Sequence, residues 1–304
     1  MTAYSKTRQA LQDHSLTPKK RFGQNFLVHR RTAEAIVRAG EVCKEDTIVE
    51  VGVGLGALTI PIAEAAGQVF GLEIDSGIIR LHQEERDLPA NVTLIHADVL
   101  KSDFGRLAEQ CGGPLKIMAN LPYSISNPFL FKLIENRERM AWATIMLQKE
   151  VAERLTAPPG TKEYGVPTVM LQSCATVRTL MTLKPAEFHP RPKIDSVVVR
   201  IDFSPVERLK GLPGYDHAIF RRIVRAAFGQ RRKTLLNALC SAELFGFLPE
   251  KGKAAGKELT GGIIQAAGLA PDIRAEVLAL EDYIHLAIET SRLIDSLSAG
   301  QEEA

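Results

Sequence analysis

Four consecutive residues, Asn120-Leu121-Pro122-Tyr123, carry the clearest chemical signal in this sequence. They follow a short apolar run that is typical of a buried strand. The side-chain oxygen of Asn120 and the backbone carbonyl of Leu121 can both accept a hydrogen bond from an exocyclic amine. Pro122 restricts φ and keeps these acceptors pointing the same way, and Tyr123 offers a ring face on which a base can stack. The set indicates methyl transfer to a nucleobase amine, with an ordinary strand-ending turn as the alternative.

A second signal is the glycine-rich segment from Glu50 to Gly56, which leaves a predicted strand and enters a predicted helix. Glycines let the backbone approach a ligand closely, and the start of a helix offers unpaired N–H groups. Glu73 ends the next predicted strand, 21 positions after Gly52. A carboxylate at that place can accept both ribose hydroxyls of an adenosine-type ligand. We therefore expect Gly52, Gly54 and Glu73 to bind a nucleotide-like cofactor.

The glycine segment also satisfies the loose dinucleotide pattern, but three features favour S-adenosylmethionine. Glu50 precedes the glycines by two positions, where it would crowd a pyrophosphate but can meet a cationic amino acid group. Asp98 follows the third strand and is suited to accept from an adenine amine, although Asp is also favoured as a helix N-cap. A dehydrogenase has no use for the segment Asn120–Tyr123. S-adenosylmethionine has a positive sulfonium and no phosphate, so it fits all three features.

Charge is balanced overall but unevenly distributed. The 38 basic and 36 acidic residues give a formal charge of +2, which alone does not indicate nucleic acid. Residues 1–38 hold eight lysines and arginines, and residues 219–233 hold six with no acid. Either cluster alone could be a solvated helix face, but beside a base-binding segment both indicate contact with a phosphate backbone. The substrate-binding residues expected there are Arg221, Arg222, Arg231, Arg232 and Lys233.

Cysteine use and hydropathy exclude several classes of protein. The four cysteines lie far apart, without Cys-x-x-Cys or paired histidine spacing, so we expect reduced thiols and no metal. The first residues are polar and charged, unlike a signal peptide. No apolar stretch approaches the roughly 20 residues of a membrane span. We expect a cytoplasmic protein with no membrane partner, and a monomer.

Short apolar runs alternate with amphipathic stretches between residues 31 and 203, which predicts a doubly wound α/β layer with a mostly parallel sheet. The predicted strands are Thr47–Val51, Gln68–Glu73, Val92–His96, Leu115–Ala119, Ala143–Leu147, Thr176–Leu183 and Val197–Phe203. The predicted helices are Thr32–Ala39, Leu58–Ala66, Ser76–Glu85, Pro128–Asn136, Lys149–Thr156 and Val166–Cys174. Proline and glycine gather between residues 204 and 214, and beyond them the pattern is helical. We thus expect a basic N-terminal arm (1–30), a methyltransferase domain (31–203) and a smaller helical domain (204–304).

Five segments together closely resemble the small-subunit (16S) ribosomal RNA adenine N6,N6-dimethyltransferases of the KsgA/RsmA type. They are Lys19–Leu27, Glu50–Thr59, Asn120–Tyr123, Phe188–Ser196 and Gln230–Leu235. The resemblance covers nearly the whole chain. It implies a Rossmann-like class I methyltransferase sheet with an antiparallel last strand, joined to a smaller all-helical C-terminal domain.

The resemblance also implies roles for particular residues. Gln24, Asn25 and Leu27 would close over S-adenosylmethionine, and Gly52, Glu73, Asp98 and Asn120 would line the rest of its pocket. The family dimethylates two adjacent adenines in a hairpin loop near the 3′ end of small-subunit rRNA, in a partly assembled subunit. The helical domain would hold the rRNA.

Catalysis is expected to come from positioning, without a general base, because a methylated ammonium loses its proton readily. Stacking on Tyr123 and on Phe188 is expected to hold an extruded adenine, with a core position as the alternative for Phe188. Two positions depart from the family pattern: Val53 stands where proline is common, which puts loop rigidity in doubt, and Gly229 replaces a bulkier polar residue.

Three other functions compete with this interpretation. A large-subunit rRNA adenine methyltransferase of the antibiotic-resistance type shares the cofactor motifs. A ribosome-assembly factor would use the same rRNA-binding surface, with binding mattering more than catalysis. A DNA adenine methyltransferase is the weakest alternative, since the sequence shows no restriction-type recognition domain.

Overall fold

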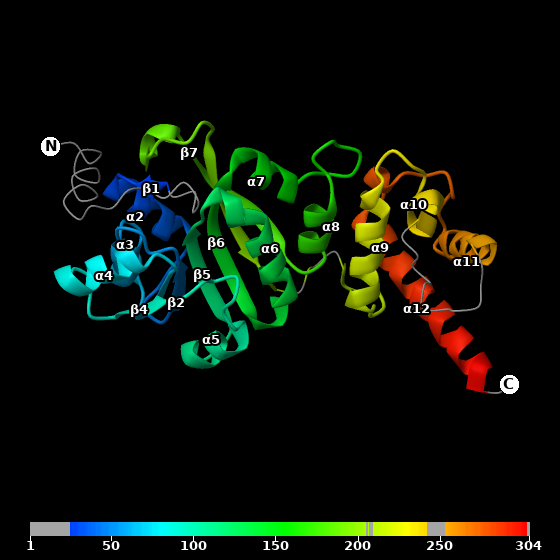
Figure 1. Cartoon of the computed structure of the whole chain (residues 1–304), viewed down its shortest axis with the longest axis horizontal. Coiled ribbons are helices and arrows are strands. Elements are labelled where there is room, and N and C mark those ends of the chain that lie inside the picture. The colour runs from blue at the N-terminus through cyan, green and yellow to red at the C-terminus, as the bar shows by residue number, and fades with distance from the viewer. Residues whose placement is uncertain (1–24, 205, 207–208, 242–252, 303–304) are drawn as a thin grey trace. The chain divides into compact units, whose positions relative to one another are not determined.

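The chain forms two compact units in the computed structural model, which describes residues 25–204, 206, 209–241 and 253–302. One unit comprises the chain up to Glu153 together with Cys174–Ser204, and the other comprises Arg154–Ser173 together with the chain after Ser204 (Figure 1). The sequence placed residues 154–173 with the methyltransferase sheet, whereas the structure groups them with the helical unit. The predicted basic arm, 1–30, lies mostly outside the described residues.

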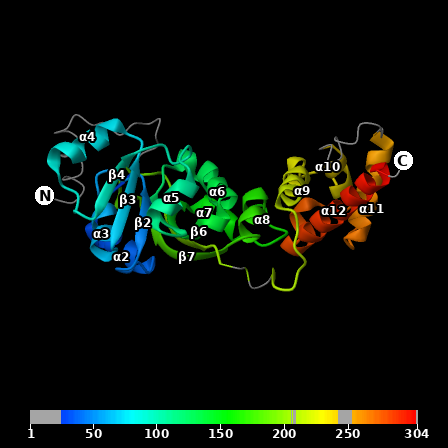
Figure 2. The same ribbon diagram turned by 90° about the horizontal axis from the view of Figure 1, so that it is seen from below.

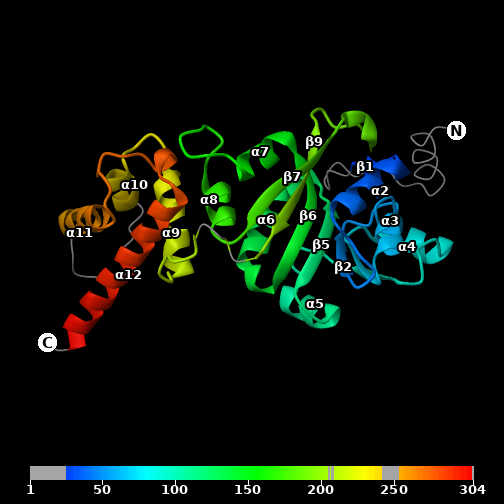
Figure 3. The same cartoon turned by 180° about the vertical axis from the view of Figure 1, so that it is seen from behind.

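The first unit is built on a seven-stranded sheet with the order β4-β3-β2-β5-β6-β9-β7. The strands are β2 (Thr47–Val51), β3 (Gln68–Glu73), β4 (Val92–His96), β5 (Leu115–Asn120), β6 (Met140–Gln148), β7 (Thr176–Leu183) and β9 (Ser196–Asp202). Among these, β9 alone runs against the others, since it pairs antiparallel with β6 and with β7 (Figure 3). The mostly parallel sheet with an antiparallel last strand is therefore confirmed.

Helices cover both faces of this sheet, so its central strands can be apolar throughout. They are α2 (Arg30–Ala39), α3 (Thr59–Ala65), α4 (Ser76–Glu85), α5 (Phe104–Cys111), α6 (Ser126–Glu135) and α7 (Lys149–Leu155). Ile36 of α2 and Ile62 of α3 are buried in one core cluster with Met118 of β5. Figure 2 shows α2 and α3 on the opposite side of the sheet from α5 and α6.

One described α-helix and two described strands of this unit were not predicted. Helix α5 has local signals that the sequence analysis did not use: Asp103 accepts from the backbone N–H groups of Gly105 and Arg106, and Gly112 ends the helix with φ +74°. The strands β1 (Phe26–Leu27) and β8 (Phe188–His189) pair antiparallel across more than 150 residues of sequence. Two-residue strands have no periodicity, so only the folded chain reveals them.

All the regular elements in the described residues of the second unit are helices, as the sequence predicted. Its helices are α8 (Val166–Gln172), α9 (His217–Gly229), α10 (Leu235–Ser241), α11 (Lys253–Ala266) and α12 (Leu280–Glu302). Phe228 of α9 stacks on Tyr283 of α12 with ring centroids 5.9 Å apart. The hydroxyl groups of Tyr164 and Tyr283 donate to the carbonyls of Leu278 and Ala275, so both buried rings keep a polar partner.

Short 3-10 turns complete the described structure at Tyr123–Ile125, Arg137–Arg139, Pro185–Glu187 and Ala275–Val277. No helix within the described ranges is long and apolar enough to cross a membrane.

Candidate functional site

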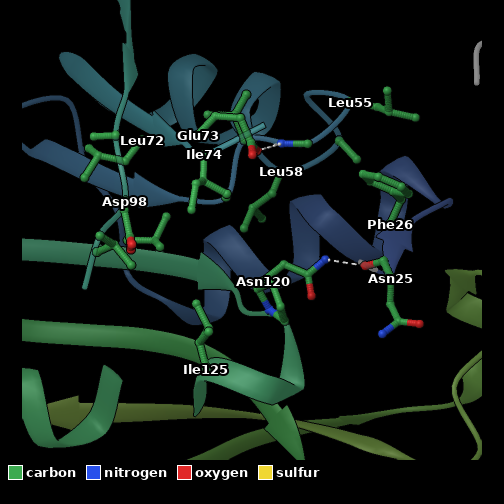
Figure 4. Close-up of a pocket in the computed structure, with 18 of the residues that line it drawn as sticks. Asn25, Phe26, Leu55, Leu58, Leu72, Glu73, Ile74, Asp98, Asn120 and Ile125 are labelled. Carbon is green, nitrogen blue, oxygen red and sulfur yellow. Dashed lines mark hydrogen bonds between the residues drawn. The ribbon is translucent and has the colours of Figure 1, made fainter. Parts of the chain in front are cut away.

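A cavity of about 180 Å³ opens at the carboxyl ends of the parallel strands. It lies beside β2, where the strand order turns from β3 on one side to β5 on the other, which is where open α/β sheets bind ligands. Its walls come from residues 25–27, from the glycine loop, from the ends of β3 and β4, and from the segment after β5 (Figure 4). The fold therefore gathers most of the predicted cofactor residues into one site.

The glycine loop adopts a backbone that only glycine tolerates well. Gly54 has φ +56°, and a Cβ there would lie 3.1 Å from the ring of Phe26. Val53, the departure from the family pattern, is buried and packs against Gly71 of β3. The N–H of Gly52 donates to the carbonyl of Leu72 over 2.8 Å. Packing and hydrogen bonds thus hold a loop that lacks proline.

Glu73 is positioned by the backbone around it. One carboxylate oxygen accepts from the N–H of Gly54 at 3.0 Å and the other from the N–H of Asp75 at 2.8 Å. The side chain is only 5% exposed, and burial raises its pKa while these N–H groups oppose the rise. Each oxygen keeps a further lone pair, so Glu73 can still accept hydroxyl groups of a ligand.

Asp98 combines both roles that the sequence left open. One carboxylate oxygen accepts from the N–H of Leu100 at 2.9 Å, which is a local turn contact, and the residue also lines the cavity. Between Asp98 and Glu73, Ile74 is 42% exposed although it is a large apolar residue (Figure 4). In this cavity wall Ile74 offers an apolar surface on which a flat ring, such as adenine, can pack.

Asn120 reaches the cavity from the end of β5, and its amide orientation is fixed. Its Nδ2 donates to the backbone carbonyl of Asn25 at 2.8 Å (Figure 4). A carbonyl can only accept, so the NH₂ group must face Asn25 and Oδ1 must face away from it. Asn120 therefore keeps Oδ1 as a hydrogen-bond acceptor, while its predicted role towards an amine stays a prediction. Asn25 and Leu27 also line the cavity, and Gln24 lies outside the described residues.

Four residues that the sequence assigned to the cofactor or adenine pocket are described in the structure but are not among those lining the cavity. Leu121 is buried, so only its backbone carbonyl is relevant. Tyr123 shares a 2.7 Å hydrogen bond between its hydroxyl and Ser196; burial raises its pKa, which Ser196 opposes. Phe188 is 1% exposed in the core cluster, because β8 is paired with β1. A base cannot reach its ring in this structure. Phe188 is therefore a core residue here, which was the alternative to a stacking role.

Glu50 is the fourth of these residues and lies beneath the glycine loop. It is 0% exposed, and neither carboxylate oxygen has a hydrogen-bond partner. Burial raises its pKa to about 8; the nearby Thr59 hydroxyl opposes the rise and the Glu73 carboxylate adds to it. Between the ordinary carboxyl pKa and about 8, folded Glu50 keeps a proton that the unfolded chain has released. The free energy of unfolding should therefore fall as pH rises through this window.

We expect Glu50→Gln to flatten this pH dependence, because glutamine does not titrate. The wild-type protein should lose on the order of a few kcal/mol of stability between about pH 5 and about pH 8. Denaturant unfolding at several pH values measures the slope. The matched control is Glu64→Gln, an exposed carboxylate paired with Arg30 at 2.6 Å, which should keep the wild-type slope. Parallel curves for Glu50→Gln and the wild type would contradict the prediction.

The predicted phosphate-binding residues lie in the helical unit, and Arg231 has an internal role. Arg221 and Arg222 lie on α9, and Arg232 and Lys233 follow it as exposed residues. Arg231 donates to the carbonyl of Lys162 at 2.9 Å and lies 3.4 Å from the carboxylate of Glu276. Arg231 therefore helps to hold the segment before α8 and is less available to an external phosphate than the sequence suggested.

Sequence reasoning missed several cavity residues. Phe26, Leu55, Ile74, Ser124 and Ile125 line it. The first two lie inside motif segments without an assigned role, and the other three lie one or two positions after a motif residue. The sequence showed that apolar residues stand close to the motif residues. Whether their side chains point into the cavity depends on how the loops fold. In the described ranges, no three or more His, Cys, Asp or Glu side chains gather where they could hold a metal ion.

Comparisons with known proteins show the family of the chain. A model of the family described as ribosomal RNA adenine dimethylase matches residues 16–249. "Ribosomal RNA small subunit methyltransferase A" of Desulfotalea psychrophila is 60% identical over 94% of this chain and 96% of the relative. The protein of that name from Syntrophus aciditrophicus is 40% identical over 92% of this chain and 96% of its own length.

Two solved structures share the fold. A dimethyladenosine transferase from Plasmodium falciparum matches with a TM-score of 0.71 and 23% identity, over 88% of this chain and 98% of that one. The 23S rRNA methyltransferase ErmE matches with a TM-score of 0.59 and 21% identity, over 88% of this chain and all of that one. At these identities the matches establish the architecture alone.

Proposed function

We propose that this chain, which belongs to the ribosomal RNA adenine dimethylase family, transfers methyl groups from S-adenosylmethionine to the N6 amines of two adjacent adenines in small-subunit rRNA. The observation that carries the proposal is the fixed amide of Asn120, which turns its oxygen away from the Asn25 carbonyl at the rim of a nucleotide-type cavity. Membership of the family is the premise, and the residues of this cavity supply the chemistry.

The residues of the cavity fit S-adenosylmethionine. Glu73 would accept ribose hydroxyls, Asp98 would accept from the adenine amine, and exposed Ile74 would cover the adenine face. The glycine loop brings backbone close to the ligand without a Cβ in the way. The bound cofactor would supply an electrophilic methyl group on a positively charged sulfur.

Asn120 and Leu121 would prepare the amine for attack. An adenine amine is a poor nucleophile because its lone pair is delocalised into the ring. Hydrogen bonds from N6–H to Asn120 Oδ1 and to the Leu121 carbonyl would draw the nitrogen towards sp³ geometry and direct its lone pair at the methyl group. As the bond from nitrogen to the methyl carbon formed, the carbon–sulfur bond would break and a neutral thioether would leave. The nitrogen would then lose its proton to water, so these residues would act by positioning and electrostatics.

The choice of the small subunit follows the names of the relatives. Both relatives described above are named as small-subunit methyltransferases, whereas the likeness to ErmE reflects a shared architecture. We further propose that the monomer acts in the cytoplasm on partly assembled small subunits, at a hairpin loop near the rRNA 3′ end. The exposed basic residues of the helical unit would hold the rRNA.

One experiment tests this function. Labelled S-adenosylmethionine is supplied with the protein to small subunits lacking the modification, to large subunits and to DNA, and the labelled base is mapped. We expect label on N6 of two adjacent adenines of the small-subunit rRNA. Label on the large subunit alone would favour the antibiotic-resistance type of enzyme. Tight association with small subunits but no label would favour an assembly factor.

The basic residues after α9 give a separate prediction about rRNA binding. Replacing Arg232 and Lys233 together with glutamine should weaken binding and reduce the salt dependence of affinity, by roughly 0.7–0.9 in the log–log slope per lost phosphate contact. Filter binding at several salt concentrations measures the slope. A matched double variant, Lys257→Gln with Arg292→Gln, removes the same charge from α11 and α12. An unchanged slope in the first variant would remove Arg232 and Lys233 from the rRNA-binding surface.

A further inference from the structure

We infer that Ser196 is a positioning residue for methyl transfer, because its hydroxyl fixes the ring of Tyr123 on which the target adenine would stack. This inference rests on the proposed function and deepens it. Ser196 acts through Tyr123, whose hydroxyl shares a 2.7 Å hydrogen bond with Ser196 Oγ. The two residues stand 73 positions apart in the sequence, so only the fold brings them together.

Tyr123 follows the cofactor cavity along the chain but turns away from it. Its neighbours Pro122 and Ser124 both line the cavity, whereas Tyr123 does not. The segment forms a tight turn in which the N–H of Ile125 donates to the carbonyl of Pro122 at 3.0 Å. Because the side chain of Tyr123 leaves this turn towards β9, its ring provides a surface outside the cofactor cavity, three residues after Asn120.

The hydroxyl contact draws the ring of Tyr123 along one edge of the sheet. In the strand order, β6 lies between β5, which ends at Asn120, and β9, which begins at Ser196 (Figure 3). Since β9 runs antiparallel to β6, and Ser196 pairs with the last residue of β6, Gln148, these strand ends lie at the same edge. The side chain of Tyr123 therefore reaches from the segment after β5 to the start of β9.

Ser196 is a fixed anchor for this ring. It is 1% exposed, and it pairs with Gln148 of β6 on one side and with Leu183 of β7 on the other. The carbonyl of the preceding residue, Asp195, accepts from the N–H of Lys149 at 3.1 Å. A hydroxyl held between two paired strands has little freedom to move, so the ring that it binds is restricted to one rotamer.

The ring of Tyr123 keeps accessible surface although its hydroxyl is engaged. Tyr123 is half-buried, whereas Tyr164 and Tyr283, whose hydroxyls are engaged in the helical unit, are 1% and 0% exposed. Phe188, the other aromatic residue expected to stack, is closed to a base in this structure. Stacking of the adenine therefore depends on Tyr123, and the motif segment Phe188–Ser196 contributes to it through its last residue.

The orientation of this ring matters because methyl transfer needs an in-line geometry. A base stacked on Tyr123 takes its plane from the ring, and that plane sets the direction of the N6 lone pair. Displacements of about 1 Å can slow such a reaction by on the order of 10²-fold. Without Ser196 the tyrosine hydroxyl would bind water and the ring could rotate, so fewer of the bound bases would be in a reactive orientation.

The test compares Ser196→Ala, Tyr123→Phe and the double variant in single-turnover methylation of unmodified small subunits. At saturating subunit and cofactor, each single variant should react roughly ten-fold more slowly than the wild type. The subunit concentration that gives the half-maximal rate should change by less than about two-fold, since the basic residues of the helical unit are unaltered. Affinity for S-adenosylhomocysteine, measured by calorimetry, should also stay within about two-fold, since neither residue lines the cavity.

The double variant separates ring positioning from a general effect on the fold. If Ser196 acts through the tyrosine hydroxyl, removing both partners should slow the reaction no more than removing one of them. Ser196→Thr keeps a hydroxyl and should react faster than Ser196→Ala. Rate losses that multiply in the double variant would show that the two residues act separately and would overturn the inference.

The matched control is Ser173→Ala. Ser173 is also a buried serine with an engaged hydroxyl, which donates to the carbonyl of Met170 at 2.8 Å, so its rate should stay within about two-fold of the wild type. A wild-type rate in Ser196→Ala would contradict the inference. If that variant does not fold, a wild-type rate in Tyr123→Phe would contradict it equally. A wild-type protein that methylates no adenine would refute the proposed function, and this inference with it.

Discussion

Asn120→Ala is expected to reduce methyl transfer by at least about 10²–10³-fold while changing cofactor affinity only a few-fold. The loss follows from removing one of two preorganised acceptors at the reacting amine, where single polar contacts have effects of this size. Cofactor affinity should change little, because Asn120 is only one residue of a wall that also contains Glu73, Asp98 and Ile74. Single-turnover methylation of unmodified small subunits and calorimetry with S-adenosylhomocysteine separate the two effects.

Asn120→Asp sharpens this prediction. Aspartate keeps an oxygen for the amine but loses the NH₂ group that donates to the Asn25 carbonyl, so two acceptors face each other across 2.8 Å. The proposed mechanism needs a side-chain acceptor in a fixed orientation. Methyl transfer by Asn120→Asp should therefore also be slow, although an acceptor is present. Full turnover by Asn120→Ala would contradict the proposed mechanism.

The second large effect is expected for Glu73→Gln, which should weaken cofactor binding roughly 10- to 100-fold. The carboxylate accepts from two backbone N–H groups, of Gly54 and of Asp75. A glutamine would turn its NH₂ group towards one of these donors in a site that is 5% exposed. A hydrogen bond to a charged group contributes about 1.5–3 kcal/mol. Losing one at Glu73 would weaken the loop that contacts the cofactor, so part of this free energy would be lost from cofactor binding.

Calorimetric titration with S-adenosylhomocysteine measures this loss. Glu64→Gln is the control, since that carboxylate is exposed and pairs with Arg30 on the surface; it should bind as the wild type does. Burial raises the pKa of Glu73, so Glu73 takes up a proton at a higher pH than an ordinary carboxylate does. When the solution is acidified, wild-type affinity for the cofactor should therefore begin to fall at that higher pH. Unchanged affinity in Glu73→Gln would exclude Glu73 from the cofactor site.

Local sequence patterns were sufficient for the sheet and for the positions of the motifs. Strand β3 and helix α4 match their predicted bounds, Gln68–Glu73 and Ser76–Glu85. The glycine loop and Asn120 both stand at the carboxyl ends of predicted strands. Hydrophobic periodicity and glycine conformation act over a few residues, so one sequence carries enough information to place these features.

The tertiary structure decided how the motif residues are used. Asn120 is oriented by a carbonyl 95 residues away, Phe188 is buried because β8 pairs with β1, and Arg231 is engaged by Lys162 and Glu276. These outcomes depend on which distant segments pack together, and spacing along the chain does not specify that. The sequence by itself therefore determined which residues could accept an amine or bind a nucleotide. Only the folded chain decided which of their atoms remain turned towards the cavity.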